Sequence, residues 1–408
     1  MKICVAQLES VKEDIHNNIQ KHLEQVKSAI HLDADLIIFP ELSVTAYEPE
    51  LASKFATSLE NKIFDPFQVL SDKKGITIGI GMPTKESNEL CISMLIFQPN
   101  AKRTYYSKQL LHSDELPYFV AGKKQMILNI KGLKVALGIC YETLQNQHIS
   151  EACQRGADIY IASVAKSKNG IKKAYKHFPK VANQFNIPIL MSNSVGYCDT
   201  FMSSGESAVW SKTGKLIEQL DSQNQGLIIY DTELEQARAH QLKIEKGQLS
   251  DLEELVQIYV DAKNALDKKG IHQWTDDYPK RSIIENDLRN DFLYVLKYNN
   301  QLIGAIHISE EQEPEYKLVD WEFDQSKALV IHRLVVDPKH QKQAFGKQLM
   351  DFAEHFAEYN KYTSVRLDAY SQNEKVITFY KRRNYLIRGE LNFPQRIYPF
   401  YCMEKEIR

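Results

Sequence analysis

A glutamate, a lysine and a cysteine each stand at the end of a stretch that is typical of a β-strand. Glu41 follows the apolar residues 36–39, and Cys140 follows the apolar residues 135–139. Lys108 follows a short aromatic stretch. In an α/β sheet, side chains at strand ends meet along the edge where ligands bind. A cysteine placed there can act as a nucleophile, a glutamate can move its proton, and a lysine can stabilise developing negative charge.

Cys140 is the candidate nucleophile. The residues before it form a buried strand, and residues 145–155 have helical composition without proline, so Cys140 is expected at a strand-to-helix turn. The N–H groups and dipole of that helix predict a thiol pKa below its ordinary value of about 8.5. The alternative is a buried structural cysteine. The segments that contain Glu41 and Lys108 favour the nucleophile.

These residue types permit amide hydrolysis through a thioester. Cys140 would attack the carbonyl carbon, and Glu41 would take the thiol proton and pass it to the departing amine. Burial and the neighbouring acid Glu115 would raise the pKa of Glu41 toward neutrality. Lys108 and the backbone N–H of Tyr141 would face the oxyanion. The alternative for Glu41 and Lys108 is an ion pair without a catalytic role.

The order of Glu41, Lys108 and Cys140 resembles the nitrilase, or carbon–nitrogen hydrolase, superfamily. The matching motifs are Phe39-Pro40-Glu41 with Tyr47, Lys108-x-x-Leu111 with Glu115, Gly138-Ile139-Cys140-Tyr141-Glu142, and Asn193-Ser194-Val195-Gly196 with Gly205-Glu206-Ser207 and Gly214. The resemblance covers roughly residues 1–240 and implies a four-layer α/β/β/α sandwich that forms homo-oligomers. Residues 141–148 and 163–167 depart from the family pattern at the expected border of the substrate pocket. Amide hydrolysis is therefore predicted, but the acyl group of the amide substrate is not.

Composition limits the remaining function classes. A chain of 408 residues suits two domains, and its 51 basic and 53 acidic side chains give no electrostatic case for nucleic-acid binding. No apolar run is long enough to span a membrane, and no signal peptide is recognised. The six cysteines are scattered without a C-x-x-C pair, which indicates neither a disulfide framework nor a metal site. We therefore expect a cytoplasmic enzyme that acts on small molecules.

A change of pattern near residue 240 predicts a domain boundary, with one domain at 1–240 and a second at 241–408. Residues 227–230 are expected to form a strand, residues 232–239 a short polar helix-like segment, and residues 242–245 a half-exposed strand. No Gly/Ser-rich linker separates the two domains.

The second domain contains a turn that suits an anionic ligand. Residues 335–347 connect an expected strand at 328–336 to an expected helix at 348–359, and a loop at a helix N-terminus binds phosphate well. This turn resembles the acetyl-CoA motif of the GNAT acetyltransferases, Gln/Arg-x-x-Gly-x-Gly/Ala, and predicts an α/β GNAT fold. The residues that the resemblance assigns to acetyl-CoA are Val336, Gln341, Lys342, Gln343, Ala344, Gly346, Lys347 and Asn373. Ala344 stands where that family usually has glycine.

Tyr380 is the candidate acid of the acetyl transfer. Asn373 and Phe379-Tyr380, followed by Asn384-Tyr385, also match the GNAT pattern, which assigns Tyr380 to protonation of the CoA thiolate. The alternative is an ordinary packing aromatic. No base for the acceptor amine is identified; the candidates are Glu310, Glu322 and His332. Residues 270–275 are expected to shape the acceptor pocket.

The sequence thus predicts a bifunctional enzyme that combines a Cys-dependent amidohydrolase with an acetyl-CoA-dependent N-acetyltransferase. Two alternatives stay open. In one, the transferase is the working half and the hydrolase is inactive. In the other, the second domain is a sensor of CoA or a metabolite. Asn373 and Tyr380 favour catalysis, whereas Ala344 favours the sensor.

Overall fold

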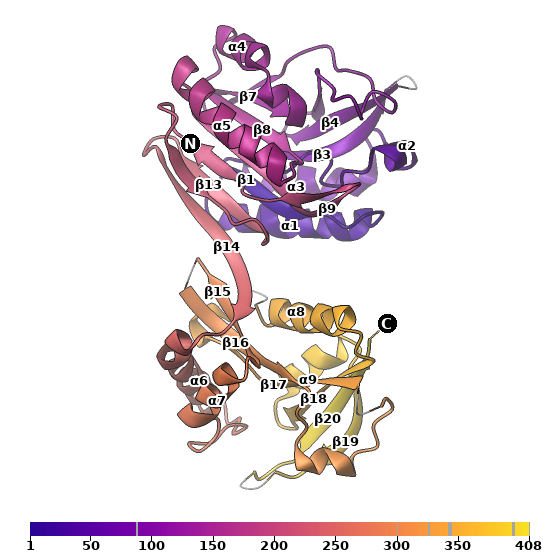
Figure 1. The fold of residues 1–408 in the computed structure, drawn as a ribbon, viewed down its shortest axis with the longest axis vertical. Coiled ribbons are helices and arrows are strands. Elements are labelled where there is room, and N and C mark those ends of the chain that lie inside the picture. The colour runs from indigo at the N-terminus through magenta and orange to yellow at the C-terminus, as the bar shows by residue number, and fades with distance from the viewer. Residues whose placement is uncertain (87–88, 300, 325–326, 342–344, 394–395, 408) are drawn as a thin grey trace. The chain divides into compact units, whose positions relative to one another are not determined.

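The computed structural model describes residues 1–86, 89–299, 301–324, 327–341, 345–393 and 396–407 (Figure 1). The chain divides into two compact units, Met1–Gln241 and Leu242–Arg408. Each unit has its own helices and hydrophobic core.

Two β-sheets form the centre of the first unit. Within the first sheet, β1, β2 and β3 are parallel and the other neighbours are antiparallel. Its strands, in spatial order, are β14 (Gln236–Lys246), β13 (Gly226–Asp231), β1 (Lys2–Glu9), β2 (Leu36–Ile38), β3 (Thr77–Glu86), β4 (Glu89–Phe97) and β5 (Thr104–Ser107).

The second sheet contains the strand that ends directly before Cys140. Its strands, in spatial order, are β6 (Ile127–Ile130), β7 (Leu133–Ile139), β8 (Ile159–Val164), β9 (Ile189–Cys198), β11 (Ala208–Trp210) and β12 (Leu216–Gln219). The end of β9 pairs with β10 (Phe201–Ser204) and with the end of β1, which joins the two sheets.

Helices cover the outer faces of both sheets, so the unit has four layers. Helices α1 (Ile15–His31) and α3 (Asp65–Lys74) cover the first sheet, and α4 (Asn146–Gln154) and α5 (Lys168–Phe185) cover the second. Strand β2 shows why the sequence folds this way. Leu36 and Ile38 face the second sheet, and Ile37 faces the helices, because successive side chains of a strand point to opposite faces. The predicted α/β/β/α sandwich is confirmed. The shorter elements are η1 (Pro49–Leu51), α2 (Ala52–Phe55), η2 (Lys62–Phe64) and η3 (Cys140–Leu144).

One sheet with helices on both faces forms the second unit, as expected for an α/β GNAT fold. Helices α6 (Leu252–Asp267) and α7 (Arg281–Arg289) cover one face, and α8 (Phe345–Tyr359) and α9 (Glu374–Lys381) cover the other. The strands, in spatial order, are the end of β14, β15 (Leu293–Tyr298), β16 (Gln301–Ser309), β17 (Ala328–Val336), β18 (Ser364–Tyr370), β20 (Phe400–Glu406) and β19 (Leu386–Leu391). The shorter elements are η4 (Leu249–Asp251), η5 (Pro314–Leu318) and η7 (Pro338–His340).

The prediction of a helix-like segment at residues 232–239 is wrong. These residues form a turn and the start of β14, which pairs with β13 as a hairpin. The carboxylate of Asp231 accepts the N–H groups of Glu233 and Leu234, and Glu235 has a φ of 49°. The hairpin lets Ala237 and Ala239 contact the core between the sheets. Polar composition alone did not reveal this pairing.

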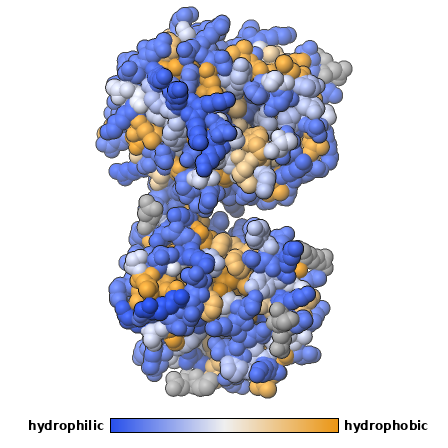
Figure 2. Space-filling model, in the orientation of Figure 1, coloured by the Kyte–Doolittle hydropathy of each residue, from blue (hydrophilic) through white to orange (hydrophobic). Residues whose placement is uncertain are grey.

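The visible face of each unit is mostly hydrophilic, with smaller apolar areas between polar side chains (Figure 2). Within the described part of the chain, no helix combines the length and the apolar character that crossing a membrane requires. The described residues also contain no group of His, Cys, Asp and Glu side chains arranged to hold a metal ion.

Candidate active site

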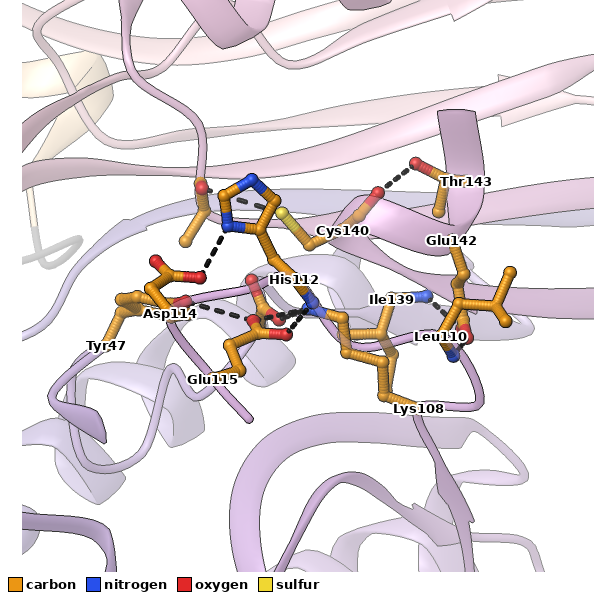
Figure 3. Close-up of polar contacts among 12 residues, drawn as sticks. Tyr47, Lys108, Leu110, His112, Asp114, Glu115, Ile139, Cys140, Glu142 and Thr143 are labelled. Atoms are coloured by element: carbon orange, nitrogen blue, oxygen red, sulfur yellow. Dashed lines mark hydrogen bonds and ion pairs between the residues drawn. The ribbon is translucent and has the colours of Figure 1, made fainter. Parts of the chain in front are cut away.

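The first unit brings Glu41, Lys108, Glu115 and Cys140 together at the ends of its strands. Glu41 follows β2, Lys108 follows β5 directly, and Cys140 follows β7. Lys108 Nζ donates hydrogen bonds to Glu41 Oε1 at 2.7 Å and to Glu115 Oε1 at 2.5 Å. The three side chains are at most 1% exposed. This arrangement is a buried cation between two carboxylates (Figure 3).

Glu115 is held in place by groups other than Lys108. Its Oε1 atom accepts the Tyr47 hydroxyl at 2.9 Å, and its Oε2 atom accepts the His112 backbone N–H at 2.7 Å. These donors stabilise a charged carboxylate without a contribution from Glu41. Glu115 is therefore held in one orientation by donors on both of its oxygens.

Glu41 has the properties of a group that exchanges a proton near neutral pH. Burial raises the pKa of its carboxyl to about 7; Lys108 opposes this rise and Glu115 adds to it. Its Oε2 atom is buried and makes no hydrogen bond of normal geometry with any described residue. The Cys140 thiol is nevertheless close enough to help lower the pKa of Glu41. The free oxygen can thus receive a proton.

Cys140 opens the 3-10 helix η3 directly after β7 and has a φ of 46°. Left-handed backbone is rare for residues other than glycine and is often found at functional sites. The prediction of a lowered thiol pKa is wrong for this state of the protein: enclosure and then Glu41 raise the pKa of Cys140 to about 11, against the effects of Lys166 and Lys108. A five-residue 3-10 helix supplies too little dipole to offset burial.

Tyr141 follows Cys140 inside η3, where the side chain is 37% exposed and its ring contacts the ring of His112 at 5.3 Å. This contact places the side chain at the rim of the site. The role of the Tyr141 backbone N–H as an oxyanion donor stays a prediction.

Glu142 is a positioning residue whose role was not predicted, although the Cys-Tyr-Glu motif contains it. Its Oε1 atom accepts the Ile139 N–H at 2.7 Å, and its Oε2 atom accepts the backbone N–H groups of Gln109 at 2.6 Å and Leu110 at 3.2 Å. One fully buried carboxylate therefore joins the turn at Cys140 to the segment that follows Lys108. The signal for this role was a glutamate two residues after the cysteine, directly beyond an apolar strand.

Lys166 is a second site residue that sequence reasoning missed. It lies in the loop after β8, is 5% exposed, and places Nζ 3.7 Å from the Cys140 sulfur. The departure of residues 163–167 from the family pattern was recognised, but the fold was needed to bring this lysine to the cysteine.

In the second unit, the elements predicted to bind acetyl-CoA surround a gap between two strands. Strands β17 and β18 pair in parallel only over residues 328–331 and 364–367, and within the described residues no further pair continues toward Val336. Val336 pairs with Gly304 on the other side. A parallel edge that opens in this way leaves backbone groups of β17 available to a ligand.

The predicted phosphate loop is described in part. Gln341 follows η7, whereas Lys342, Gln343 and Ala344 lie outside the described residues. Gly346 lies in the first turn of α8, and a Cβ there would meet no heavy atom of the described residues within 4 Å apart from its own helix backbone and chain neighbours. Lys347 Nζ pairs with Asp351 at 2.9 Å. The open space at Gly346 and the gap beside β17 fit a CoA ligand, and the Lys347 ammonium already has a partner.

Asn373 and Tyr380 lie at the two ends of α9. Asn373 caps the helix by accepting the Val376 N–H at 3.4 Å, and it donates to Gln273 Oε1 at 2.8 Å. Tyr380 is buried against the rings of Phe379 and Tyr385. Burial raises the pKa of its hydroxyl, which therefore stays protonated at neutral pH.

The candidate acceptor bases differ in their surroundings. Glu322 pairs with Arg388, and Glu310 accepts the Tyr362 hydroxyl at 2.8 Å. Burial lowers the pKa of His332, so its imidazole is neutral at physiological pH. A cavity of about 250 Å³ lies beside the segment predicted to shape the acceptor pocket, and its lining includes His272, Trp274, Thr275 and Tyr370.

An α/β/β/α sandwich with a buried glutamate and lysine beside a partly exposed cysteine at its strand ends defines the nitrilase class of fold. The model of the carbon–nitrogen hydrolase family matches residues 2–241, and the model of the acetyltransferase (GNAT) family matches residues 252–385. The chain belongs to the carbon–nitrogen hydrolase family, and a GNAT acetyltransferase domain follows in the same chain. The predicted fusion is confirmed.

Similar proteins were found for the first unit. A glutamine-dependent NAD(+) synthetase of Acinetobacter baylyi is 25% identical over 244 residues, which cover 58% of this chain and 45% of that protein. A probable nitrilase of Schizosaccharomyces pombe is 26% identical over 240 residues, covering 55% and 86%. A solved structure of the amidase from Nesterenkonia sp. AN1 has a TM-score of 0.53 at 21% identity, covering 57% and 92%. The chain thus spans less than half the length of the synthetase, and the solved structure supports the fold alone.

Proposed function

We propose that the first unit hydrolyses a small amide through a thioester on Cys140. The observation that carries this proposal is the buried group of Glu41, Lys108 and Glu115 beside the thiol, in which the pKa of Glu41 is raised to about 7 by burial. A carboxyl with that pKa can alternate between base and acid during one turnover.

The steps follow from the positions of the side chains. Glu41 takes the proton of Cys140 as the sulfur attacks the carbonyl carbon. The oxyanion is stabilised by Lys108 and the Tyr141 N–H, and the amine leaves with the proton that Glu41 held. Water then attacks the thioester while Glu41 takes its proton, and collapse of the second intermediate releases the acid and restores the thiol.

Small amides are the substrate class we propose, in preference to nitriles. The names of the similar proteins include an amidase and a glutamine-dependent synthetase as well as a probable nitrilase. We prefer amides because they are the commoner substrate class of the superfamily that the sequence resembles. We would measure ammonia release from a panel of short aliphatic amides, glutamine and asparagine, together with the intact mass of the protein. Turnover with an acyl adduct that Cys140→Ala abolishes is expected. Equal turnover by wild type and Cys140→Ala would contradict the thioester mechanism.

Amide hydrolysis should rise with pH around a midpoint near 7. Glu41 accepts the thiol proton only when ionised, and burial raises the pKa of its carboxyl to about 7. Activity is therefore lost as pH falls below that value. Glu115→Gln removes a negative charge that raises this pKa, so its midpoint should lie at lower pH. We would measure kcat/KM from about pH 5 to 9. A midpoint that Glu115→Gln raises would contradict the assignment.

We propose that the second unit transfers acetyl from acetyl-CoA to a small amine. The opening between β17 and β18, the space at Gly346 and the cap residue Asn373 support CoA binding. Acetyl-CoA, when bound, supplies the activated acetyl group. Tyr380 is protonated and can donate its proton to the leaving thiolate. Calorimetry with acetyl-CoA, followed by a thiol-release assay over a panel of amines, tests the proposal. Binding without release would support a sensor instead.

Gly346 gives a structural test of the CoA site. Gly346→Leu should weaken acetyl-CoA binding at least about tenfold, because its side chain would fill the space beside the first turn of α8. Gly346→Ala adds one methyl group and should change affinity little, while it stabilises the helix by up to about 1 kcal/mol. The measurement is calorimetric Kd together with thermal unfolding. Equal affinity in all three proteins would place the ligand elsewhere.

We further propose that both units act on one small nitrogen metabolite in a reducing, cytoplasmic setting, as a homo-oligomer. All six cysteines are free thiols, which agrees with a reducing compartment. Light scattering would test the oligomer, and an assay of each unit on the product of the other would test the shared metabolite.

A further inference from the structure

Lys166 places a buried ammonium against the sulfur of Cys140. Its Nζ atom lies 3.7 Å from Cys140 Sγ and 3.5 Å from the Cys140 carbonyl oxygen, and the residue is 5% exposed. The Cys140 sulfur therefore contacts Lys166 on one side while Glu41 is close enough to affect its ionisation.

Lys166 differs from the other lysine of the site in its lack of a counter-ion. Lys108 contacts two carboxylates, whereas no described carboxylate lies within 4.0 Å of Lys166 Nζ. A buried charge without a partner is costly unless another state of the protein supplies one. Besides Lys166, the titratable groups that act on the thiol are Glu41, Lys108 and Glu115, and Lys166 also acts on His177; burial and then Lys166 lower the pKa of His177, which stays neutral. A thiolate on Cys140, whose sulfur lies 3.7 Å from Lys166 Nζ, would be such a partner.

The side chain of Lys166 is not needed to hold its loop. The Lys166 N–H donates to Asn193 Oδ1 at 2.8 Å, and the Lys166 carbonyl oxygen accepts the Ser204 N–H at 2.9 Å and the Ser203 hydroxyl at 3.2 Å. The backbone groups of Lys166 thus hold the loop without its side chain. The contact to the Cys140 carbonyl is at the outer limit of hydrogen-bond length, so it contributes little to the fold.

We propose that Lys166 is a catalytic residue that pairs with the Cys140 thiolate, a role that rests on the proposed hydrolase function. When the thiol proton moves to Glu41, the negative charge on the sulfur faces the Lys166 ammonium. Lys108 meanwhile stays with Glu115 and the oxyanion. The two lysines therefore have different roles: Lys108 stabilises the oxyanion, and Lys166 stabilises the thiolate sulfur. Burial raises the pKa of the thiol, and of the two lysines that oppose this rise Lys166 acts more strongly.

Alkylation of Cys140 tests the proposal without any amide substrate, because the thiolate is the species that reacts with iodoacetamide. We would measure the rate at the Cys140 peptide by mass spectrometry, as a function of pH, in wild type, Lys166→Met and Lys166→Arg. Lys166→Met should move the midpoint upward by about one pH unit and slow the reaction about tenfold at neutral pH. Lys166→Arg should restore most of the rate. An unchanged profile in Lys166→Met would overturn the proposal.

Two controls separate this role from others. Lys168→Met removes a charge from an exposed neighbour and should leave the profile as in wild type. Iodoacetate carries a negative charge where iodoacetamide has an amide. If Lys166→Met slows iodoacetate alone, Lys166 binds a substrate carboxylate and the thiolate role is overturned. Loss of amide turnover over the whole panel, with the Lys166 effect on alkylation intact, would contradict the proposed hydrolase function and not this inference.

Discussion

Glu41→Gln should lower kcat/KM for amide hydrolysis by about 10²–10⁴-fold, the range that a positioned acid–base group contributes. Glutamine keeps the shape of the side chain and a hydrogen-bond acceptor for Lys108, but it cannot take the thiol proton. Lys108 also keeps Glu115 as a counter-ion at 2.5 Å, so the variant should fold. The measurement is steady-state ammonia release with thermal unfolding alongside.

The matched control for this variant is Cys140→Ala, which removes the nucleophile and leaves Glu41 and Lys108 paired. Both variants should lose turnover, but only Glu41→Gln should still form a covalent adduct with iodoacetamide at Cys140. A loss smaller than tenfold in Glu41→Gln would show that another group carries the proton. A loss accompanied by unfolding would show instead that Glu41 is mainly structural.

Arg366→Met should destabilise the second unit by about 3–5 kcal/mol, because it breaks a fully buried ion pair. Arg366 Nε donates to Glu404 Oε1 at 2.9 Å, and neither side chain is exposed. The guanidinium also donates to the Phe323 carbonyl oxygen at 2.6 Å and lies 4.5 Å from the ring centre of Trp321. Its removal would leave the buried Glu404 carboxylate with Arg388, whose Nε lies 3.5 Å from Glu404 Oε2, as its remaining cationic partner among the described residues.

A double variant separates the cost of losing the Arg366 charge beside Glu404 from the loss of packing. Arg366→Met with Glu404→Leu removes both charges and should be less destabilised than Arg366→Met alone. Chemical denaturation of the full chain measures both, and the transition of the first unit should not move. Equal destabilisation of the single and double variants would show that packing around the guanidinium, and not charge burial, is the main contribution.

Much of the fold followed from strand and helix periodicity. The apolar residues before Glu41 and Cys140 are buried strands, and residues 364–370 form β18 as expected. The resemblance supplied the layer order, because periodicity does not tell how sheets stack. Residues 232–239 were misjudged since their short polar run hides an alternation of Ala237 and Ala239 toward the core.

The site was partly predictable for a different reason. Glu41, Lys108 and Cys140 follow strands, so their convergence could be expected from topology. Lys166 follows a strand as well, but its contact with the sulfur depends on the path of a loop fixed by Asn193, which no local pattern encodes. The pKa of the Cys140 thiol depends on enclosure by groups distant in sequence. It could not be inferred from the helix expected at residues 145–155. Charge burial is a property of the folded site.

The Oε2 atom of Glu41 has a consequence for inhibitor design. Oε2 makes no hydrogen bond of normal geometry with any described residue and is already shielded from solvent. Binding of an inhibitor therefore does not have to remove water from this oxygen. A reversible warhead for Cys140, such as an aldehyde, gains from a neighbouring N–H group that reaches this oxygen. A compound of the same shape without that donor leaves the acceptor unsatisfied. Selectivity among thiol-directed compounds would then come from one hydrogen-bond donor and less from the reactive group itself.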